Sequence, residues 1–320
     1  MYFPAAGIEV SPWIPPLVAF GISLLTSSGG ISGAVLLLPY QMSYLGYVNP
    51  SVSATNHFFN MVAIPSGVYR YCREGRMIWP LAWVIVAGTL PGALVGAVAR
   101  VRYLPDPDHF RLFAACVLFY LGSRLLKDID WKSDLFPAQK TNGAPPDETN
   151  SGAKGSQGGA AGDWTIQDLK FGWNRLRYRF QGTEYGVSVV GLFFLSLVVG
   201  LVGGIYGIGG GAIIVPFLVT FFKLPVHSVA GAALMGTCVT STASVLFYQI
   251  LAPFCPGFSV APDWLLGALF GLGGLGGMYV GARLQKFLPA PAIKAIVCFI
   301  LLLTAIRYVS ATLNLGALMD

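Results

Sequence analysis

Residues 203–217 read GGIYGIGGGAIIVPF and lie inside a segment, 185–222, that carries no charged residue. Four glycines fall within five positions, at 207 and 209–211, and each costs a helix interior about 1 kcal/mol relative to alanine. The stretch therefore predicts a broken helix. Inside hydrocarbon, such a break persists only where protein or a water-filled cavity satisfies its backbone. Transporters use exposed N–H groups and helix ends of this kind to hold anions. The alternative is that the glycines only let helices pack closely.

The composition around this stretch is that of an integral membrane protein. The chain has 320 residues, of which 55% are hydrophobic and 11% charged, whereas soluble domains carry about 25% charged residues. Apolar runs of about 20 residues predict membrane-spanning helices and not a barrel. The net charge of +6 comes from loops and segment ends, so it indicates orientation in the bilayer, and we expect no nucleic-acid partner. The sequence has no metal-ligand spacing, and we expect no metal and no cofactor.

The second half of the chain repeats the first at nearly constant offsets. Gly30, Gly33 and Pro39 recur 177 residues later as Gly207, Gly210 and Pro216, and Gly88, Gly92 and Gly96 recur 185 later as Gly273, Gly277 and Gly281. The fold predicted is an all-α integral membrane protein of two repeats, each with a broken helix–break–helix segment plus three transmembrane helices. The glycines spaced by four residues are predicted to be helix-packing faces.

Three regions follow from this duplication. Residues 1–127 form the first membrane repeat, 128–182 a linker, and 183–320 the second membrane repeat. Residues 137–162 of the linker are rich in Pro, Gly, Ser and Asn, which predicts disorder or variability. Residues 173–180 alternate Arg with apolar side chains before Gln181-Gly182. This pattern favours a short basic strand and a turn, with an interfacial amphipathic helix as the alternative.

The distribution of charge predicts how the repeats face. The loop 70–76 carries three Arg, whereas its counterpart, 249–263, has no Lys or Arg. By the positive-inside rule, corresponding loops then lie on opposite faces, so the repeats are inverted. We expect a multi-pass protein of the bacterial cell inner membrane, with a cytoplasmic linker and both termini outside. Inversion requires the broken segments, with legs near 187–206 and 211–223, to act as hairpins; whether they are re-entrant or fully crossing stays open.

The run GIGGGAIIVPFL at 207–218 resembles the hallmark of the sulfite exporter TauE/SafE family of membrane permeases, and residues 29–39 are similar to a weaker copy of it. The copy has Ser32 and Ala34 where the second half has Gly209 and Gly211, so the half-sites can play unequal roles. The resemblance covers nearly all of the chain outside 128–182. It implies a secondary transporter, not an enzyme, for small sulfur-containing anions such as sulfite, sulfoacetate or related organosulfonates.

The candidate binding groups are neutral, because residues 10–69 and 186–222 contain no Asp, Glu, Lys or Arg. A small anionic substrate would be held by backbone N–H groups, helix dipoles and polar side chains. The predicted site comprises Gly29, Gly30, Ser32, Gly33, Asn56, His57, Asn60, Tyr206, Gly207, Gly209, Gly210, Gly211, Thr237, Thr240 and Ser241, with Ser27, Ser28 and Thr242 nearby. The Ser and Thr hydroxyls can instead bond carbonyls of their own helix. His57 can serve a neighbouring helix, contact the substrate or handle protons.

Arginines near helix ends, Arg100, Arg124, Arg283 and Arg307, are predicted to be snorkelling anchors; alternatively they draw anions towards an entrance on the inner face. An anion channel or facilitator, or a transporter of non-sulfur organic anions, remains the alternative function. The coupling ion stays open between proton, sodium and none. The expected partners are the small anionic substrate and the lipid bilayer, and a homo-oligomer is also compatible with the sequence.

Overall fold

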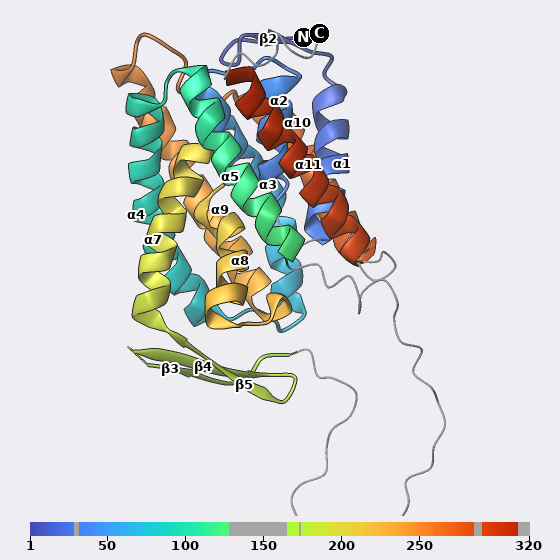
Figure 1. The fold of residues 1–320 in the computed structure, drawn as a ribbon, viewed down its shortest axis with the longest axis vertical. Coiled ribbons are helices and arrows are strands. Elements are labelled where there is room, and N and C mark those ends of the chain that lie inside the picture. The colour runs from blue at the N-terminus through green and yellow to red at the C-terminus, as the bar shows by residue number, and fades with distance from the viewer. Residues whose placement is uncertain (29–31, 128–164, 173, 285–289, 313–320) are drawn as a thin grey trace, which may run out of the picture.

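The computed structural model describes residues 1–28, 32–127, 165–172, 174–284 and 290–312. It is a bundle of helices with a short hairpin, β1 (Tyr2–Phe3) and β2 (Ile8–Glu9), at one end and a three-stranded sheet at the other (Figure 1). Within these described residues, six helical segments are long and apolar enough to cross a membrane: Trp79–Tyr103, Pro107–Lys127, Val189–Tyr206, Ser228–Phe254, Trp264–Gly281 and Ala295–Thr312. The chain is therefore a helical, multi-pass membrane protein.

Each half of the chain contains a pair of helices separated by a break, followed by three further helices. The first half consists of α1 (Ile14–Ser28), α2 (Ala34–Ser43), α3 (Ser51–Arg73), α4 (Trp79–Tyr103) and α5 (Pro107–Lys127). The second consists of α7 (Val189–Tyr206), α8 (Gly210–Phe222), α9 (Val226–Leu251) with the turn η1 (Ala252–Phe254), α10 (Trp264–Leu284) and α11 (Ala290–Thr312). The predicted order of one broken segment and three plain helices is thus present twice.

The broken pairs enter and leave the bundle at the same end. At 1.5 Å per residue, α2 and α8 are about 15 and 20 Å long, too short to cross about 30 Å of hydrocarbon. The pair α7–α8 starts and finishes beside the three-stranded sheet, since β5 runs directly into α7 and Ser228 of α9 bonds Tyr178 of the sheet. The pair α1–α2 starts and finishes beside the N-terminal hairpin, where Ser51 of α3 bonds the carbonyl of Ala5. The two broken pairs thus enter the bundle from opposite ends.

Glycine faces on two long helices join the halves of the chain. A Cβ added at Gly92 of α4 would lie 2.2 Å from the Leu197 carbonyl oxygen of α7. A Cβ at Gly273 of α10 would lie 2.0 Å from the Pro16 carbonyl oxygen of α1. Backbones can approach this closely only because the intervening positions lack side chains. The predicted packing faces are therefore correct, and each one seats the first broken helix of the other half.

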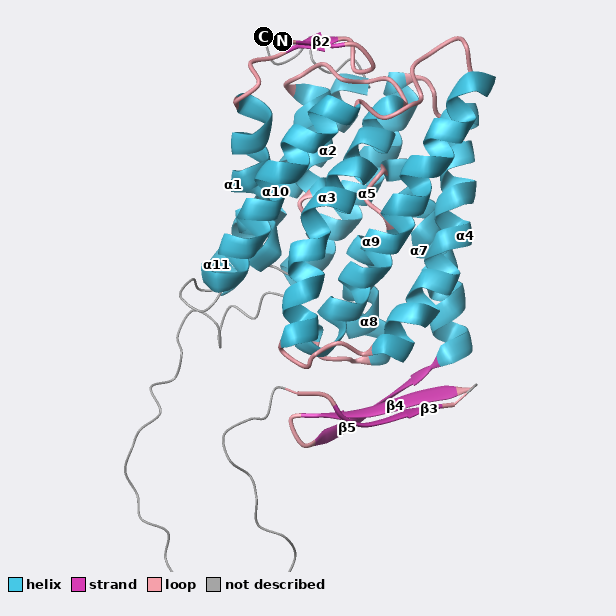
Figure 2. Ribbon diagram, turned by 180° about the vertical axis from the view of Figure 1, so that it is seen from behind, coloured by secondary structure: helices cyan, strands magenta, loops and turns pink. Residues whose placement is uncertain are grey.

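The sheet consists of β3 (Gln167–Phe171), β4 (Arg175–Phe180) and β5 (Thr183–Ser188), all antiparallel, and lies across one end of the bundle (Figure 2). Strand β4 is the strand expected over 173–180. Gln181 and Gly182 both have positive φ, 50° and 77°, as a tight hairpin turn requires. Strand β5 lies beyond residue 182, the predicted end of the linker, and residues 137–162 fall outside the described part of the chain.

One face of β4 packs under the helices, and the other is exposed. Leu176, Tyr178 and Phe180 are buried, whereas the intervening arginines are exposed. The hydroxyl of Tyr178 lies 2.8 Å from that of Ser228 at the start of α9. Burial raises the pKa of Tyr178 to about 12, so this phenol stays neutral throughout the physiological range. The hydrogen bond and the apolar face together hold the sheet against the membrane bundle.

Candidate functional site

The break between α7 and α8 has a backbone conformation that depends on glycine. Gly207 follows α7 in the left-handed region, at φ 88° and ψ 23°. The N–H groups of Gly207 and Ile208 both donate to the Gly203 carbonyl, at 2.9 and 3.0 Å, as at many helix C-termini. Gly209 then takes φ 72° and ψ 140°, a combination that is essentially restricted to glycine. The predicted break is therefore present, and it spans residues 207–209.

The same glycines are enclosed by neighbouring helices. A Cβ added at Gly207 would lie 2.6 Å from Cα of Ser53 on α3, and one at Gly209 2.8 Å from Oγ of Ser241 on α9. At Gly211 it would lie 2.1 Å from the Ala233 carbonyl oxygen. The close-packing alternative considered from the sequence thus applies as well, because the glycines both break the helix and seat the break against α3 and α9.

Asn60 of α3 joins the two broken segments. Its Oδ1 accepts a 2.7 Å hydrogen bond from Ser32, directly before α2, and its Nδ2 donates 2.9 Å to the Ile208 carbonyl in the second break. The second N–H of the amide has a long contact, 3.5 Å, with Ser241 Oγ. Asn60, Ser32 and Ser241 are all buried. One amide therefore holds both half-sites, and one of its donors is only weakly engaged.

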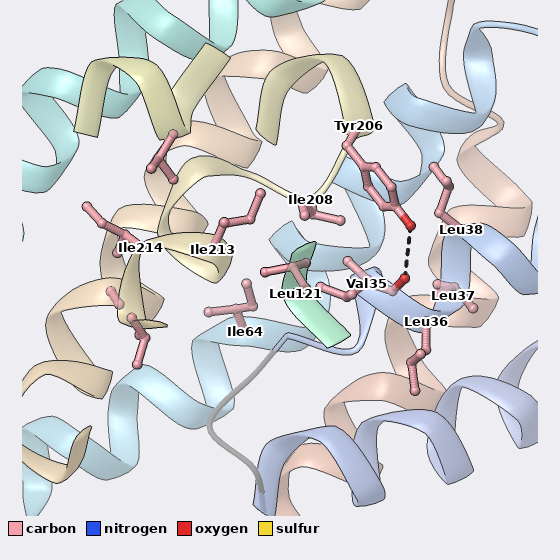
Figure 3. Close-up of a cluster of buried hydrophobic side chains, with 14 of the residues drawn as sticks. Val35, Leu36, Leu37, Leu38, Ile64, Leu121, Tyr206, Ile208, Ile213 and Ile214 are labelled. Carbon is pink, nitrogen blue, oxygen red and sulfur yellow. Dashed lines mark hydrogen bonds between the residues drawn. The ribbon is translucent and has the colours of Figure 1, made fainter. Parts of the chain in front are cut away.

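Other predicted side chains lie around this amide and cross-link the same elements. His57 Nδ1 lies 3.2 Å from Ser241 Oγ, and Asn56 Nδ2 donates 3.0 Å to the Ala34 carbonyl at the start of α2. Tyr206 donates 3.2 Å to the Val35 carbonyl, a contact drawn among the buried apolar side chains in Figure 3. The hydroxyl of Tyr206 thus ties the end of α7 to the first turn of α2, and Figure 3 shows the two segments side by side.

Several predicted donors are used within their own helices. Thr237, Thr240 and Thr242 each donate to the carbonyl four residues earlier, at 3.0, 2.7 and 2.8 Å, and Ser27 bonds Leu24. Hydrogen bonds to carbonyls of the same helix are the alternative given above for these hydroxyls. Gly33 precedes α2, where an added Cβ would lie 2.8 Å from Ser23 Oγ, and Gly210 is enclosed by Thr89 and Gly200. Gly29 and Gly30 lie outside the described residues.

The first turn of α8 contributes backbone N–H groups to the candidate site. Its N-cap residue is Gly209, which has no side chain to cap the helix start, whereas Ser32 Oγ accepts from the Ala34 N–H at the start of α2. The first N–H groups of a helix have no partner within the helix and carry the positive end of its dipole. Because an uncapped helix start beside Ser241 and Asn60 is a suitable environment for an anion, the second half-site is the stronger candidate.

Sequence reasoning missed two buried residues at this site. Ser53 donates 3.2 Å to the Ile205 carbonyl, and Tyr248 donates 3.3 Å to the Gly204 carbonyl, both at the end of α7. Ser53 could have been found, because it precedes Asn56, His57 and Asn60 at helical spacing on one face of α3. Tyr248 extends the corresponding face of α9 from Ser241 by about two turns. In the sequence a single tyrosine beside Gln249 and apolar residues is indistinguishable from a core aromatic.

The arginines near helix ends differ from one another. Arg307 is exposed at the last turns of α11, as an anchor would be, and nothing is described for the side chain of Arg283. Arg100 is fully buried, so the anchor prediction is wrong for this residue. It also lies towards the end of α4 that is remote from the sheet, because α4 begins beside Gly75, which accepts from Ile166 at the sheet. An entrance at the sheet end is therefore not where Arg100 acts.

Comparison with known proteins gives one clear result. The family model described as "Sulfite exporter TauE/SafE" matches residues 16–308, which is most of the chain and includes both broken segments. No curated protein and no solved structure matches the chain.

Proposed function

Because the chain belongs to the sulfite exporter TauE/SafE family of membrane transporters, we propose that it carries small sulfur oxyanions, such as sulfite, sulfoacetate or related organosulfonates. We propose the breaks of the two half-sites as the binding region. The observation that carries this proposal is the position of Asn60, which bonds Ser32 at one break and the Ile208 carbonyl at the other. A ligand bound beside Asn60 contacts both halves of the chain at once.

The chemistry of the groups around Asn60 favours an anion. A sulfonate presents three acceptor oxygens, so it needs several converging donors. The start of α8, the Ser241 hydroxyl, His57 and the weakly engaged N–H of Asn60 supply donors from buried positions. Such preoriented dipoles hold an anion without a full positive charge. These donors all converge on the Gly207–Gly209 break from α3, α8 and α9.

The proposed orientation puts the three-stranded sheet in the cytoplasm of a bacterial cell and both ends of the chain outside the inner membrane. Support comes from the sheet-end loop, which contains Arg70, Arg73 and Arg76, while the loop 249–263 at the other end has no Lys or Arg. Cytoplasmic loops carry such an excess of basic residues. The exposed arginines of β4 also lie at the sheet end.

The test is uptake of radiolabelled sulfite, sulfoacetate and taurine into proteoliposomes that contain the protein, with chloride and lactate as competitors. Saturable flux with counterflow, blocked by one sulfonate and not by lactate, is the expected result. Flux without saturation or counterflow would indicate a channel instead of a carrier. A folded protein that transports lactate and none of the sulfur anions would overturn the proposed substrate class and leave the family's architecture in place.

A further inference from the structure

Arg100 is a buried positive charge, and no carboxylate among the described residues pairs with it. Its Nη1 donates to the Leu104 carbonyl, and its guanidinium carbon lies 3.7 Å from the centre of the Phe110 ring. Nε and Nη2 have no hydrogen-bond partner among the described residues. The acids of the same loop are already engaged, since Asp106 accepts from the N–H of Asp108, and Asp108 pairs with Arg111. A buried charge is costly unless it is paired, and the described part of the chain supplies no counter-ion at this position.

The two unpartnered nitrogens lie on one edge of the guanidinium. Nε–H and the adjacent Nη2–H point in parallel, and this edge is the one that arginine uses to bind two oxygens of one carboxylate, phosphate or sulfonate. The opposite edge, Nη1, is held by the backbone of Leu104. The side chain is thus fixed at one edge and free at the edge that recognises oxyanions.

Several buried polar groups lie between the broken helix and the part of α4 that carries Arg100. Ser241 lies 3.2 Å from His57 Nδ1, and the ring of His57 lies 6.1 Å from that of Tyr248. Tyr248 in turn packs in one buried cluster with Ala97 and Val101 of α4, on the turn that carries Arg100. Further unpartnered atoms of described residues, His57 Nε2 and Ser244 Oγ, belong to the same faces of α3 and α9. Because membrane helices seldom bury polar groups without a function, their alignment indicates a path.

We propose that the Nε–Nη2 edge of Arg100 is an oxyanion-binding station on the substrate path, between the break and the end of the bundle remote from the sheet. This inference rests on the proposed function and adds the fixed positive charge that the break itself lacks. The anion passes from the neutral donors at Asn60 and Ser241 along His57 and Tyr248, and then pairs with the guanidinium. Neighbouring Arg102 is exposed and provides a matched control.

The experiment measures thermal unfolding of the purified protein in detergent, with sulfite, sulfate, phosphate and lactate titrated separately, beside uptake of sulfite into proteoliposomes. The variants are Arg100→Lys, Arg100→Met and the matched controls Arg102→Lys and Arg102→Met. Lysine keeps the charge but cannot make the two-pronged contact. We therefore expect Arg100→Lys to raise the dissociation constant and the KM for sulfite at least tenfold, equivalent to about 1.4 kcal/mol. The Arg102 variants should behave as the wild type.

The variant Arg100→Met distinguishes an anion-binding role of Arg100 from a purely structural role. Removing an uncompensated buried charge should leave the anion-free Tm equal to or above that of the wild type, while the rise in Tm with sulfite disappears. A structural arginine would instead give a lower anion-free Tm in Arg100→Met and a wild-type dissociation constant in Arg100→Lys. Either result, or a full sulfite-dependent rise in Arg100→Met, would overturn the proposal.

The two proposals fail in different ways. If wild-type liposomes take up no sulfur anion, but oxyanions raise the Tm of the wild type and not of Arg100→Met, the substrate assignment fails and the Arg100 station stands. If sulfite is transported and Arg100→Met keeps the wild-type KM, the station fails and the transport function stands. If no oxyanion either stabilises the protein or is transported, both are overturned.

Discussion

Replacing Asn60 with leucine tests the link between the two half-sites. Leucine is similar in size and removes the bonds to Ser32, 2.7 Å, and to the Ile208 carbonyl, 2.9 Å. In soluble proteins each buried group left unpaired costs about 1–3 kcal/mol, or roughly 2–6 kcal/mol for two. Hydrogen bonds between membrane helices average only about 0.6 kcal/mol, because the unfolded chain in the membrane also finds partners. We therefore expect a loss of about 1–2 kcal/mol, which leaves the variant folded.

The effect of Asn60→Leu on transport should be larger than its effect on stability. A hydrogen bond to a charged group contributes about 1.5–3 kcal/mol, so losing the weakly engaged N–H should raise the KM for sulfite by about 10- to 100-fold. The assay is liposome uptake beside thermal unfolding in detergent. The control is Thr304→Val on α11, whose hydroxyl bonds Ile300 of its own helix at 2.7 Å and should leave the KM unchanged. An unchanged KM in folded Asn60→Leu would refute this account of the site.

Three further perturbations test other parts of the structure. Gly210→Leu should abolish uptake while the protein remains inserted, because a Cβ there would lie 2.6 Å from Thr89 Cγ2; wild-type flux would contradict this. Gly273→Ala should destabilise the protein by about 1–3 kcal/mol through overpacking. The control Gly276→Ala on the same helix should not, because the nearest atom to its added Cβ would be 3.4 Å away. Equal unfolding temperatures of the two variants would refute the packing argument. Tyr178→Phe should cost about 1 kcal/mol and speed hydrogen exchange in β4. Because the pKa of Tyr178 is raised to about 12, its stabilising contribution in the wild type should be full below about pH 10 and fall as the pH rises towards 12. A difference in unfolding free energy between wild type and Tyr178→Phe that is zero at every pH would contradict this.

Sequence patterns predicted the parts of this fold that depend on backbone chemistry. The glycines at 207–211 predicted the break because positive φ at Gly207 and Gly209 leaves few other residues possible. The four-residue glycine spacing predicted the packing faces for a similar reason, since close approach excludes side chains. The alternation along β4 was equally informative, because one face of the strand is buried under the bundle.

The fate of individual polar side chains could not be predicted in the same way. Thr240 and Ser241 are neighbours in sequence, yet one bonds its own helix and the other lies against His57 and Asn60. That choice depends on how α9 is rotated about its own axis, and the pattern of residues along α9 does not reveal this rotation. In the sequence Arg100 resembles any anchor at a helix end, and only its burial against the Phe110 ring in the structure reveals a buried cation.

The reciprocal seating of α4 on α7 and of α10 on α1 has a consequence for biosynthesis. When the ribosome has made the first five helices, the groove along Gly88, Gly92 and Gly96 has no occupant, and α1 still lacks the helix that will cover it. Neither half can complete its packing by itself, so the first half must wait in the membrane until the second emerges. Two separately synthesised halves should dock in the same manner, because the contacts of α4 with α7 and of α10 with α1 lie between the halves and not within either half. The two halves of this single chain thus associate as the two subunits of a dimer do.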